Sequence, residues 1–250
     1  MPEEKSHIYF LSDAHLGVPD HSSSLLRERK LVQWLHQIKP TAKAIYFLGD
    51  IFDFWFEYKH VVPKGHVRLF GTIAQFTDEG IPVHFFPGNH DLWVKDYFTT
   101  EMGMQIHPAP MRAQFCGHTF YIAHGDGLGQ GDRNYKLLKK VFTCPLCQWL
   151  FARLHPNFAV GLARYLSRRS RMASRDEEAT FLGEDKEFLI AYAKEILKTE
   201  HFDYFVFGHR HLPLEIPLNE HSTYYNLGEW FNRFTYGVFD GENFELRTFE

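Results

Sequence analysis

The chain has 250 residues, 44% of them hydrophobic, and a formal net charge of −4 from 27 Lys and Arg against 31 Asp and Glu. This length and apolar content suffice for a well-packed core and exclude intrinsic disorder. The slightly acidic balance argues against general nucleic-acid binding, and three cysteines are too few for a disulfide framework and suit a reducing compartment. Histidine is unusually frequent, with 16 residues. Each can serve as a metal ligand or as an acid or base near neutral pH.

The N-terminus carries no recognisable export signal. Residues 1–7 are polar and acidic and run directly into a strand-like stretch, without the basic start and apolar run of a signal peptide. The longest apolar stretches, such as residues 141–154, are interrupted by polar residues and fall short of the roughly 20 residues that cross a bilayer. We therefore expect a cytoplasmic protein that does not cross a membrane but can lie on its surface.

The first ninety residues alternate between strand and helix patterns. Strands are predicted at residues 7–11, 44–48 and 83–86, where short β-branched and aromatic runs end in polar loops. Helices are predicted between them, at residues 24–38 and 67–77, because apolar residues recur there at helical spacing. This alternation is typical of an α/β protein with a largely parallel sheet, in which functional sites gather at the carboxyl ends of the strands.

The later part of the chain has a different pattern. Short runs at residues 204–207, 223–227, 234–239 and 244–249 predict antiparallel additions to a sheet. Residues from about 132 to 198 are helical in pattern. We predict that they form an insertion within a single domain that spans residues 1–250.

Polar residues follow the predicted strands in turn. They form five short motifs, which are Ser12-Asp13-Ala14-His15, Gly49-Asp50-Ile51-Phe52-Asp53, Gly88-Asn89-His90-Asp91, His124-Gly125-Asp126 and Gly208-His209-Arg210-His211. Any one of them alone is better explained as a solvated turn. Five in succession, each after a strand of an α/β pattern, are not explained by turn chemistry.

The residue types in these motifs predict a two-metal hydrolytic site. Imidazole and carboxylate together suit Mn²⁺, Fe²⁺ or Zn²⁺, and an Asp placed between two cations can bridge them with its two oxygens. Two ions about 3.5–4 Å apart can clamp the attacking and leaving oxygens of an in-line displacement at phosphorus. The glycines before Asp50, Asn89 and His209 permit positive φ and a close backbone approach where the strands end.

In this order the motifs resemble those of the calcineurin-like metallophosphoesterases, over the whole chain except the insertion. The resemblance implies a four-layer α/β/β/α sandwich with two divalent metal ions at its apex. It implies two overlapping sets of ligands, Asp13, His15, Asp50 and His211 for one ion and Asp50, Asn89, His124 and His209 for the other. Asp50 would bridge the two ions.

The resemblance also assigns roles to the neighbours of these ligands. It implies that His90 contacts the phosphate or protonates the leaving oxygen. Three further carboxylates, Asp53, Asp91 and Asp126, match the motifs and are expected to orient the ligands rather than bind metal.

Longer segments are similar to the UDP-2,3-diacylglucosamine hydrolases of lipid A synthesis. They include residues 49–55, 208–213 and 226–230, and the pair Asp132 and Tyr135 after His124-Gly-Asp. This resemblance implies hydrolysis of the pyrophosphate of UDP-2,3-diacylglucosamine to UMP and 2,3-diacylglucosamine 1-phosphate. We then expect Mn²⁺, with Fe²⁺ or Zn²⁺ as alternatives, and substrate contacts from Asp132, Tyr135 and Arg171.

The insertion alternates bulky apolar residues with Lys and Arg. Amphipathic basic helices of this kind can lie on an anionic membrane, and a groove between them can hold acyl chains. Composition alone favours an ordinary lid with a solvated basic face. With the resemblance, we expect a cap that binds a nucleotide-linked lipid at the cytoplasmic face of the inner membrane, and no nucleic-acid partner.

One residue departs from the proteobacterial hydrolases, which carry Arg at the position of His90. An Arg would grip phosphate, whereas a His can act as a general acid. Our first hypothesis is therefore a more distant branch of the same hydrolases. Two alternatives stay open: a metallophosphodiesterase that acts on another nucleotide or on nucleic acid, and a non-catalytic, metal-bound scaffold.

Overall fold

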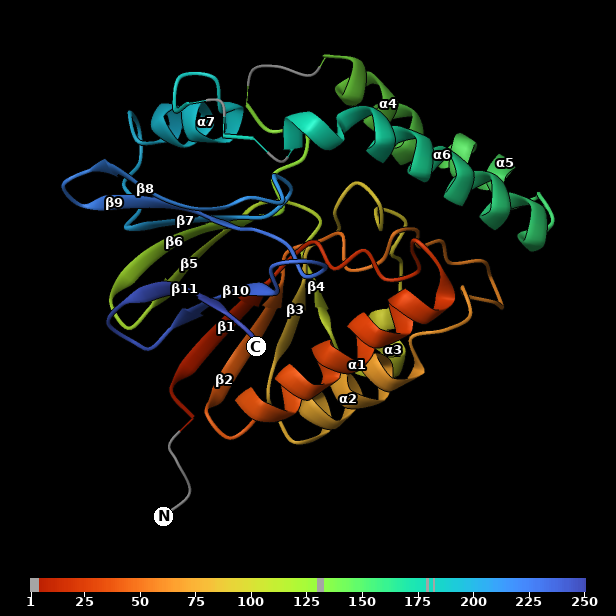
Figure 1. Ribbon diagram of the computed structural model, residues 1–250, viewed down its shortest axis with the longest axis horizontal. Helices are drawn as coiled ribbons and strands as arrows, with labels where there is room; N and C mark the ends of the chain where they lie inside the picture. Colours follow the sequence, from red (N-terminus) through yellow and green to blue (C-terminus); the bar gives the residue numbers. More distant parts are fainter. Residues whose placement is uncertain (1–4, 130–132, 179, 182) are drawn as a thin grey trace.

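Two β-sheets pack face to face between helices (Figure 1). The computed structural model describes residues 5–129, 133–178, 180–181 and 183–250. The first sheet has the order β11-β10-β1-β2-β3-β4, with strands β1 (His7–Leu11), β2 (Ala42–Phe47), β3 (Val83–Phe85), β4 (Gln105–Ile106), β10 (Thr235–Phe239) and β11 (Phe244–Thr248). The second has the order β5-β6-β7-β9-β8, with strands β5 (Met111–Phe115), β6 (His118–Ala123), β7 (Tyr204–Phe207), β8 (Pro213–Asn219) and β9 (Ser222–Leu227).

Each sheet has a parallel centre and antiparallel edges. Strands β1 to β4 run parallel, and β10 and β11 add to them in antiparallel pairs, as expected for the C-terminal strands. In the second sheet β6, β7 and β9 run parallel, and β5 and β8 close the two edges in antiparallel pairs. The antiparallel addition expected at residues 204–207 was therefore wrong, and residues 223–227 pair in parallel with β7 and antiparallel only with β8. The parallel strands therefore bring their carboxyl ends together, where the polar motifs begin.

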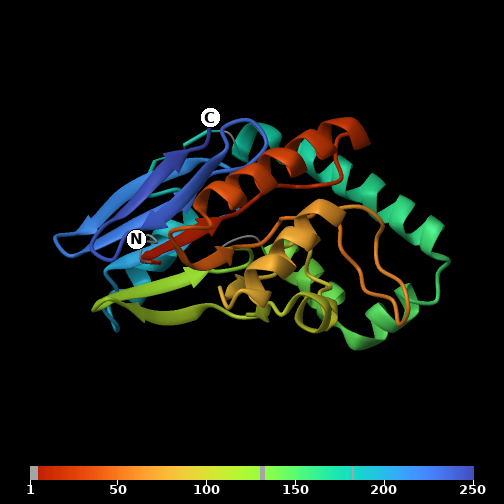
Figure 2. The same ribbon diagram turned by 90° about the horizontal axis from the view of Figure 1, so that it is seen from below.

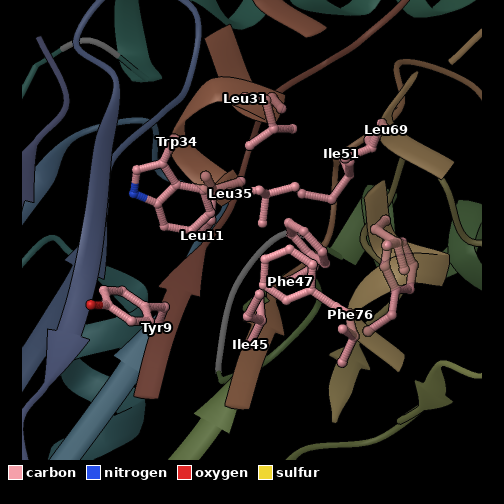
Figure 3. Close-up of a cluster of buried hydrophobic side chains, with 14 of the residues drawn as sticks. Tyr9, Leu11, Leu31, Trp34, Leu35, Ile45, Phe47, Ile51, Leu69 and Phe76 are labelled. Atoms are coloured by element: carbon pink, nitrogen blue, oxygen red, sulfur yellow. The ribbon is translucent and has the colours of Figure 1, made fainter. Parts of the chain in front are cut away.

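Helices α1 (His21–Ile38), α2 (Val67–Asp78) and α3 (Tyr97–Met102) cover the outer face of the first sheet (Figure 2). Alternate residues of β1 point to opposite sides of that sheet. Tyr9 and Leu11 pack with Leu31 and Trp34 of α1 (Figure 3), whereas Phe10 points between the two sheets.

On the far side, α7 (Phe188–Ile196) packs Leu189, Ile190 and Ala193 against the second sheet. Three separate apolar clusters thus fill the spaces between four successive layers. The expected α/β/β/α sandwich is confirmed.

Several elements differ from the sequence-based expectation. Helix α1 begins three residues before the expected start at residue 24, because the side chain of Asp20 accepts a bond from the backbone N–H of Ser23 (2.9 Å) and caps the helix. Strand β8 was missed because Pro213 and Pro217 interrupt its pattern. It lies at a sheet edge, where proline is tolerated. The short elements β4, β5 and α3 were missed as well.

The remaining helices, α4 (Arg133–Thr143), α5 (Pro145–Phe151) and α6 (Pro156–Glu178), lie above the loops that follow the parallel strands (Figure 1). Trp93 Nε1 donates to the carbonyl of Phe142 in α4 (2.7 Å). The ring of Phe151 in α5 packs 4.8 Å from that of Phe56 and 4.8 Å from that of Trp93. Aromatic contacts therefore fix these helices to the loops. In the described ranges, no helix is both long and apolar enough to span a membrane.

The N-terminus of α2 is capped by Glu28 of α1 and not by the residue that precedes α2. His66 precedes α2 and makes no capping bond with its side chain. Instead, Oε1 of the buried Glu28 accepts bonds from the backbone N–H groups of Arg68 (3.0 Å) and Leu69 (3.3 Å). The two helices are therefore joined by a carboxylate at the positive end of α2.

Glu28→Ala should lower the free energy of unfolding by about 1–3 kcal/mol, because two N–H groups at the start of α2 lose their acceptor. Urea denaturation followed by circular dichroism measures the change. Glu79→Ala is the matched control, since Glu79 is 53% exposed and pairs with Lys39 at the surface. It should cost less than about 1 kcal/mol, and equal losses in the two variants would contradict the capping role.

Candidate metal centre

Backbone hydrogen bonds join the ends of strands from both sheets. The N–H of Asp13, after β1, donates to the carbonyl of Gly49, after β2 (3.1 Å). The N–H of Gly208, after β7, donates to the carbonyl of His124, after β6 (2.9 Å). His124 Nδ1 lies 2.6 Å from the carbonyl oxygen of Leu48 and connects the two sheets. These bonds connect four of the five motifs. The fifth, at residues 88–91, is connected to them through the side chain of Asp91.

A first group of ligand atoms comes from Asp13, His15 and His211. The Nε2 atoms of His15 and His211 lie 3.0 Å apart. Oδ1 of the fully buried Asp13 lies 3.2 Å from Nε2 of His211 and 3.8 Å from Nε2 of His15, and it accepts no hydrogen bond. Two imidazole nitrogens and a carboxylate oxygen thus converge on one point.

A second group comes from Asp50, His124 and His209. Oδ2 of Asp50 lies 3.5 Å from Nε2 of His124. Oδ1 of Asn89 joins this group, 3.3 Å from Nε2 of His124 and 3.0 Å from Nδ1 of His209. This group offers one carboxylate, one amide and two imidazoles.

Asp50 lies between the two groups. Its Oδ2 is 3.5 Å from His124 of the second group and 3.9 Å from Nε2 of His15 in the first. Its Oδ1 accepts a bond from the backbone N–H of His90 (2.8 Å), which fixes the plane of the carboxylate. Asp50 is therefore placed as a shared ligand would be.

The donor set fits two divalent cations. The carbonyl of Leu48 can only accept, so Nδ1 of His124 carries a proton and Nε2 is the nitrogen that faces Asp50. Burial lowers the pKa of His124, but the charge of Asp50 and its hydrogen bond, together with the charges of Asp13 and Asp126, raise that pKa to about 10. His124, His90 and His15 in turn hold the pKa of Asp50 well below its usual value, against the effect of burial. A cation bound here would displace the imidazole proton and take over its role in balancing the carboxylate.

The backbone is left-handed at five of the expected ligands, which are Asp13 (φ 54°), His15 (φ 42°), Asp50 (φ 53°), His209 (φ 70°) and His211 (φ 49°). Few residues other than glycine adopt this conformation, although Asp and His tolerate it better than most. Such strain persists only where surrounding contacts enforce it, and it is typical of functional sites.

The glycines before the ligands act mainly through their lack of a side chain. Gly49 has the expected positive φ of 77°, but Gly88 and Gly208 do not, so that part of the expectation was wrong. A Cβ at Gly88 would come 2.3 Å from Oδ1 of Asp50, and one at Gly208 would come 1.9 Å from Oγ of Ser12. Close backbone approach is the constraint at both positions.

Asp91 connects two of the ligand-bearing loops. Its buried carboxylate accepts bonds from four backbone N–H groups: those of Gly88 (2.7 Å), Asp50 (3.2 Å), Ile51 (2.9 Å) and Phe52 (3.3 Å). Burial and the charge of Asp50 raise its pKa to about 7. This geometry agrees with an orienting role for Asp91.

Asp53 lies beside two histidines. Its Oδ1 is 3.8 Å from Nδ1 of His15 and 3.8 Å from Nδ1 of His90. Nδ1 of His90 is also 3.0 Å from the carbonyl oxygen of Asp53, which requires a proton on Nδ1. Ser167 of α6, which sequence reasoning missed, donates to Oδ2 of Asp53 (3.1 Å) and lies 3.1 Å from Nδ1 of His90.

Asp126 contacts another of the helices above the loops, α4. Its Oδ2 lies 2.6 Å from Nζ of Lys139 in α4. His124 and Lys139 lower the pKa of Asp126 against the effect of burial. Neither Lys139 nor Ser167 carries a sequence signal, because each lies in an amphipathic pattern where polar residues face solvent by default.

Three expected substrate contacts lie outside the described part of the structure. Asp132 falls between the described ranges, and the side chains of Tyr135 and Arg171 are likewise not described. Their roles remain predictions from the sequence.

Comparison with known proteins gives consistent matches. Residues 6–213 match the calcineurin-like phosphoesterase family. The UDP-2,3-diacylglucosamine hydrolase of Porphyromonas gingivalis is 39% identical over 98% of this chain and 98% of its own length. Hydrolases of the same name from Edwardsiella ictaluri (28% identity, 82% of this chain, 75% of that protein) and Actinobacillus succinogenes (26%, 89%, 91%) are also similar. Among solved structures, Yfce, a phosphoesterase from E. coli, aligns with a TM-score of 0.44 at 14% identity over 94% of this chain and 88% of that one.

Asp91→Asn should destabilise the protein and weaken its binding of Mn²⁺, because one amide oxygen cannot accept four N–H bonds and the amide NH₂ would face donors. We expect a loss of about 1–3 kcal/mol in unfolding free energy. We also expect metal affinity to fall at least about tenfold, as is typical when a residue that hydrogen-bonds to a metal ligand is replaced. Denaturant titration and isothermal titration with Mn²⁺ give the two values. Asp78→Asn, at the exposed end of α2, should change neither, and wild-type metal affinity in Asp91→Asn would refute the orienting role.

Proposed function

This chain belongs to the calcineurin-like phosphoesterase family, and on that premise we propose that it hydrolyses the pyrophosphate bond of UDP-2,3-diacylglucosamine. The observation that carries the proposal is the 39% identity, over 98% of both chains, to a protein named UDP-2,3-diacylglucosamine hydrolase. The products would be UMP and 2,3-diacylglucosamine 1-phosphate. The family implies divalent metal ions, and the grouped Asp and His residues are suited to hold them.

The proposed ligands divide as the two groups do. Asp13, His15 and His211 would hold one ion and Asn89, His124 and His209 the other, with Asp50 shared between them. We propose Mn²⁺ because carboxylate, amide and imidazole donors without thiolate suit it, with Fe²⁺ or Zn²⁺ as alternatives. When bound, the ions would supply positive charge at the phosphoryl oxygens and activate the attacking water.

His90 is the proposed proton donor to the leaving oxygen. The carbonyl of Asp53 fixes the proton on Nδ1, so Nε2 is the nitrogen that can donate when the ring is charged. Its side chain is 12% exposed and the ring centroid lies 4.7 Å from that of His15, so it borders the first group while remaining accessible. Ser167 and Asp53 hold the ring in that orientation.

The helices above the site are proposed to bind the lipid and the membrane surface. We propose that residues 132–198 are an insertion whose helices α4 to α6 form a cap, within one domain. Most of the exposed large apolar side chains of the described residues lie on these helices, including Leu146 (63%), Trp149 (52%), Leu150 (54%) and Phe158 (61%). Exposed Lys140, Arg153 and Arg169 accompany them. An apolar face with basic flanks suits an anionic membrane surface, and the cytoplasmic face of the inner membrane would be its location.

Purified protein with Mn²⁺ should release UMP from UDP-2,3-diacylglucosamine, measured by chromatography of the nucleotide. Asp50→Asn should lose metal and lower kcat by more than about 10³-fold, because both proposed sites lose a ligand. His90→Gln should keep both ions and lower kcat by about 10²- to 10⁴-fold, because it removes proton transfer alone. If the protein hydrolyses a soluble phosphodiester but releases no UMP from the lipid, the proposed substrate is wrong. The phosphoesterase activity itself would then still be supported.

The double change Trp149→Glu and Leu150→Glu should reduce binding to vesicles of phosphatidylethanolamine and phosphatidylglycerol, because it places two charges on the apolar face of α5. Co-sedimentation with the vesicles measures the bound fraction. Leu26→Glu on α1 is the matched control, because Leu26 is 65% exposed and lies outside the inserted helices. Equal binding by the double variant and the control would contradict a membrane-binding cap.

A further inference from the structure

Arg210 lies between two of the proposed metal ligands, and its side chain pairs with a residue of another segment. The flanking residues, His209 and His211, belong to the two different groups of ligand atoms. The guanidinium of Arg210 forms a two-pronged ion pair with Glu187, with Nε to Oε2 at 2.8 Å and Nη2 to Oε1 at 2.8 Å. The side chains of Arg210 and Glu187 are only 8% and 2% exposed.

The partners of Arg210 belong to the segment that returns from the inserted helices. Glu187 immediately precedes α7, which packs on the outer face of the second sheet, and its side chain makes no capping bond to that helix. The carbonyl of Thr180 accepts a further bond from Nη2 of Arg210 (3.1 Å). The ion pair therefore joins the loop after β7 to the start of α7, where the ring of Phe188 also lies 6.1 Å from that of His209.

The loop that carries Arg210 is strained. His209 and His211 both have left-handed backbones, and the N–H of Arg210 donates to the carbonyl of Gly208 only two residues earlier (2.9 Å). On the metal side, the N–H of His209 donates to Oδ2 of Asp13 (2.8 Å). His211 is placed by ring contacts with His15 and Phe231 and by its approach to Asp13. A rigid ion pair at Arg210 would fix the backbone of this loop and so hold the imidazoles of His209 and His211 in place.

We propose that Arg210 is a positioning residue for both metal ions, which it serves through its buried ion pair with Glu187. The proposal rests on the proposed metal sites but not on the substrate. Arginine is suited to this role because its planar fork meets a carboxylate with two parallel bonds and fixes orientation as well as distance. A buried ion pair contributes little net stability compared with apolar residues of similar volume, so positioning and stability can be separated by experiment.

The test is the double variant Arg210→Met with Glu187→Leu, which removes both charges and keeps most of the volume. Single changes would leave one buried charge without its partner and endanger the fold. We expect the double variant to keep its circular dichroism spectrum and lose at least tenfold in Mn²⁺ affinity at both sites by isothermal titration. The electron paramagnetic resonance signal of the coupled Mn²⁺ pair should also be broadened or lost.

A matched control is available at the surface. Arg112 pairs with Glu200 through two contacts, at 3.2 and 2.9 Å, but these side chains are 57% and 44% exposed and lie away from the ligand groups. Arg112→Met with Glu200→Leu should leave Mn²⁺ affinity unchanged. Arg210→Lys keeps the positive charge but cannot form the two parallel bonds of the guanidinium to Glu187. We expect this variant to bind Mn²⁺ more weakly than the wild type and more tightly than the double variant.

Full Mn²⁺ affinity and an unchanged resonance signal in the double variant would overturn the proposal. If that variant does not fold, wild-type affinity in Arg210→Lys would overturn it instead. Failure of the proposed function is a separate result. Wild-type protein that binds two Mn²⁺ ions but releases no UMP from the lipid would refute the substrate and leave the role of Arg210 to be decided by metal binding.

Discussion

The site depends on a left-handed backbone at five residues that supply ligand atoms. At about 1 kcal/mol or more for each, the strain approaches roughly 5 kcal/mol, comparable with the net stability of an ordinary domain. Other contacts must therefore offset it. Asp91 holds four backbone N–H groups around Asp50, and Asp13 accepts bonds from Ser12 Oγ and from the N–H of His209. Each buried polar contact that enforces the strain is a place where a substitution affects metal binding and stability together.

Parallel strands of both sheets end in the region that holds the candidate ligands, although β4 and β9, which are also parallel, are followed by none of the five motifs. The parallel strands β1, β2, β3, β6 and β7 direct their carboxyl ends to one region, and each is followed by a motif. Strand β10 runs antiparallel to β1, so the loop before it reaches the same region from the other direction. In that loop Glu229 accepts backbone bonds from Phe231, Asn232 and Arg233, and the ring of Phe231 contacts both His15 and His211. The loop between β9 and β10 thus supplies packing to the first group rather than a candidate ligand.

The sequence predicted most of the fold and the composition of the site. The period-2 and helical patterns located β1, β2, β3, β7 and both long helices of the first layer, because these elements bury one regular face. Strand β8 carries two prolines at a sheet edge, and β4 has two residues, so neither gives a pattern. That the candidate ligands lie together could be predicted because each follows a strand. The contacts of Ser167, Lys139 and Glu187 were not, because they depend on how helices separated in sequence meet the loops.

Histidine content by itself does not indicate a metal site. His84 and His107 resemble His15 and His211, since Nδ1 of His84 lies 2.9 Å from Nε2 of His107, and the other pair is 3.0 Å apart. However, His84 stacks on Tyr46, and burial together with His107 lowers its pKa to about 4. Within the described residues, no carboxylate completes a group of three ligand atoms around this pair.

The pair His15 and His211 differs from the pair His84 and His107 because two carboxylates, Asp13 and Asp50, lie beside it. Oδ1 of Asp13 lies 3.2 Å from Nε2 of His211, and Oδ2 of Asp50 lies 3.9 Å from Nε2 of His15. Two neutral imidazoles without a nearby negative charge offer little to offset the dehydration of a divalent cation, whereas buried carboxylates gain most when a cation arrives. The charge that would attract a metal ion to these groups therefore comes from the aspartates, and the histidines would determine which metals suit them.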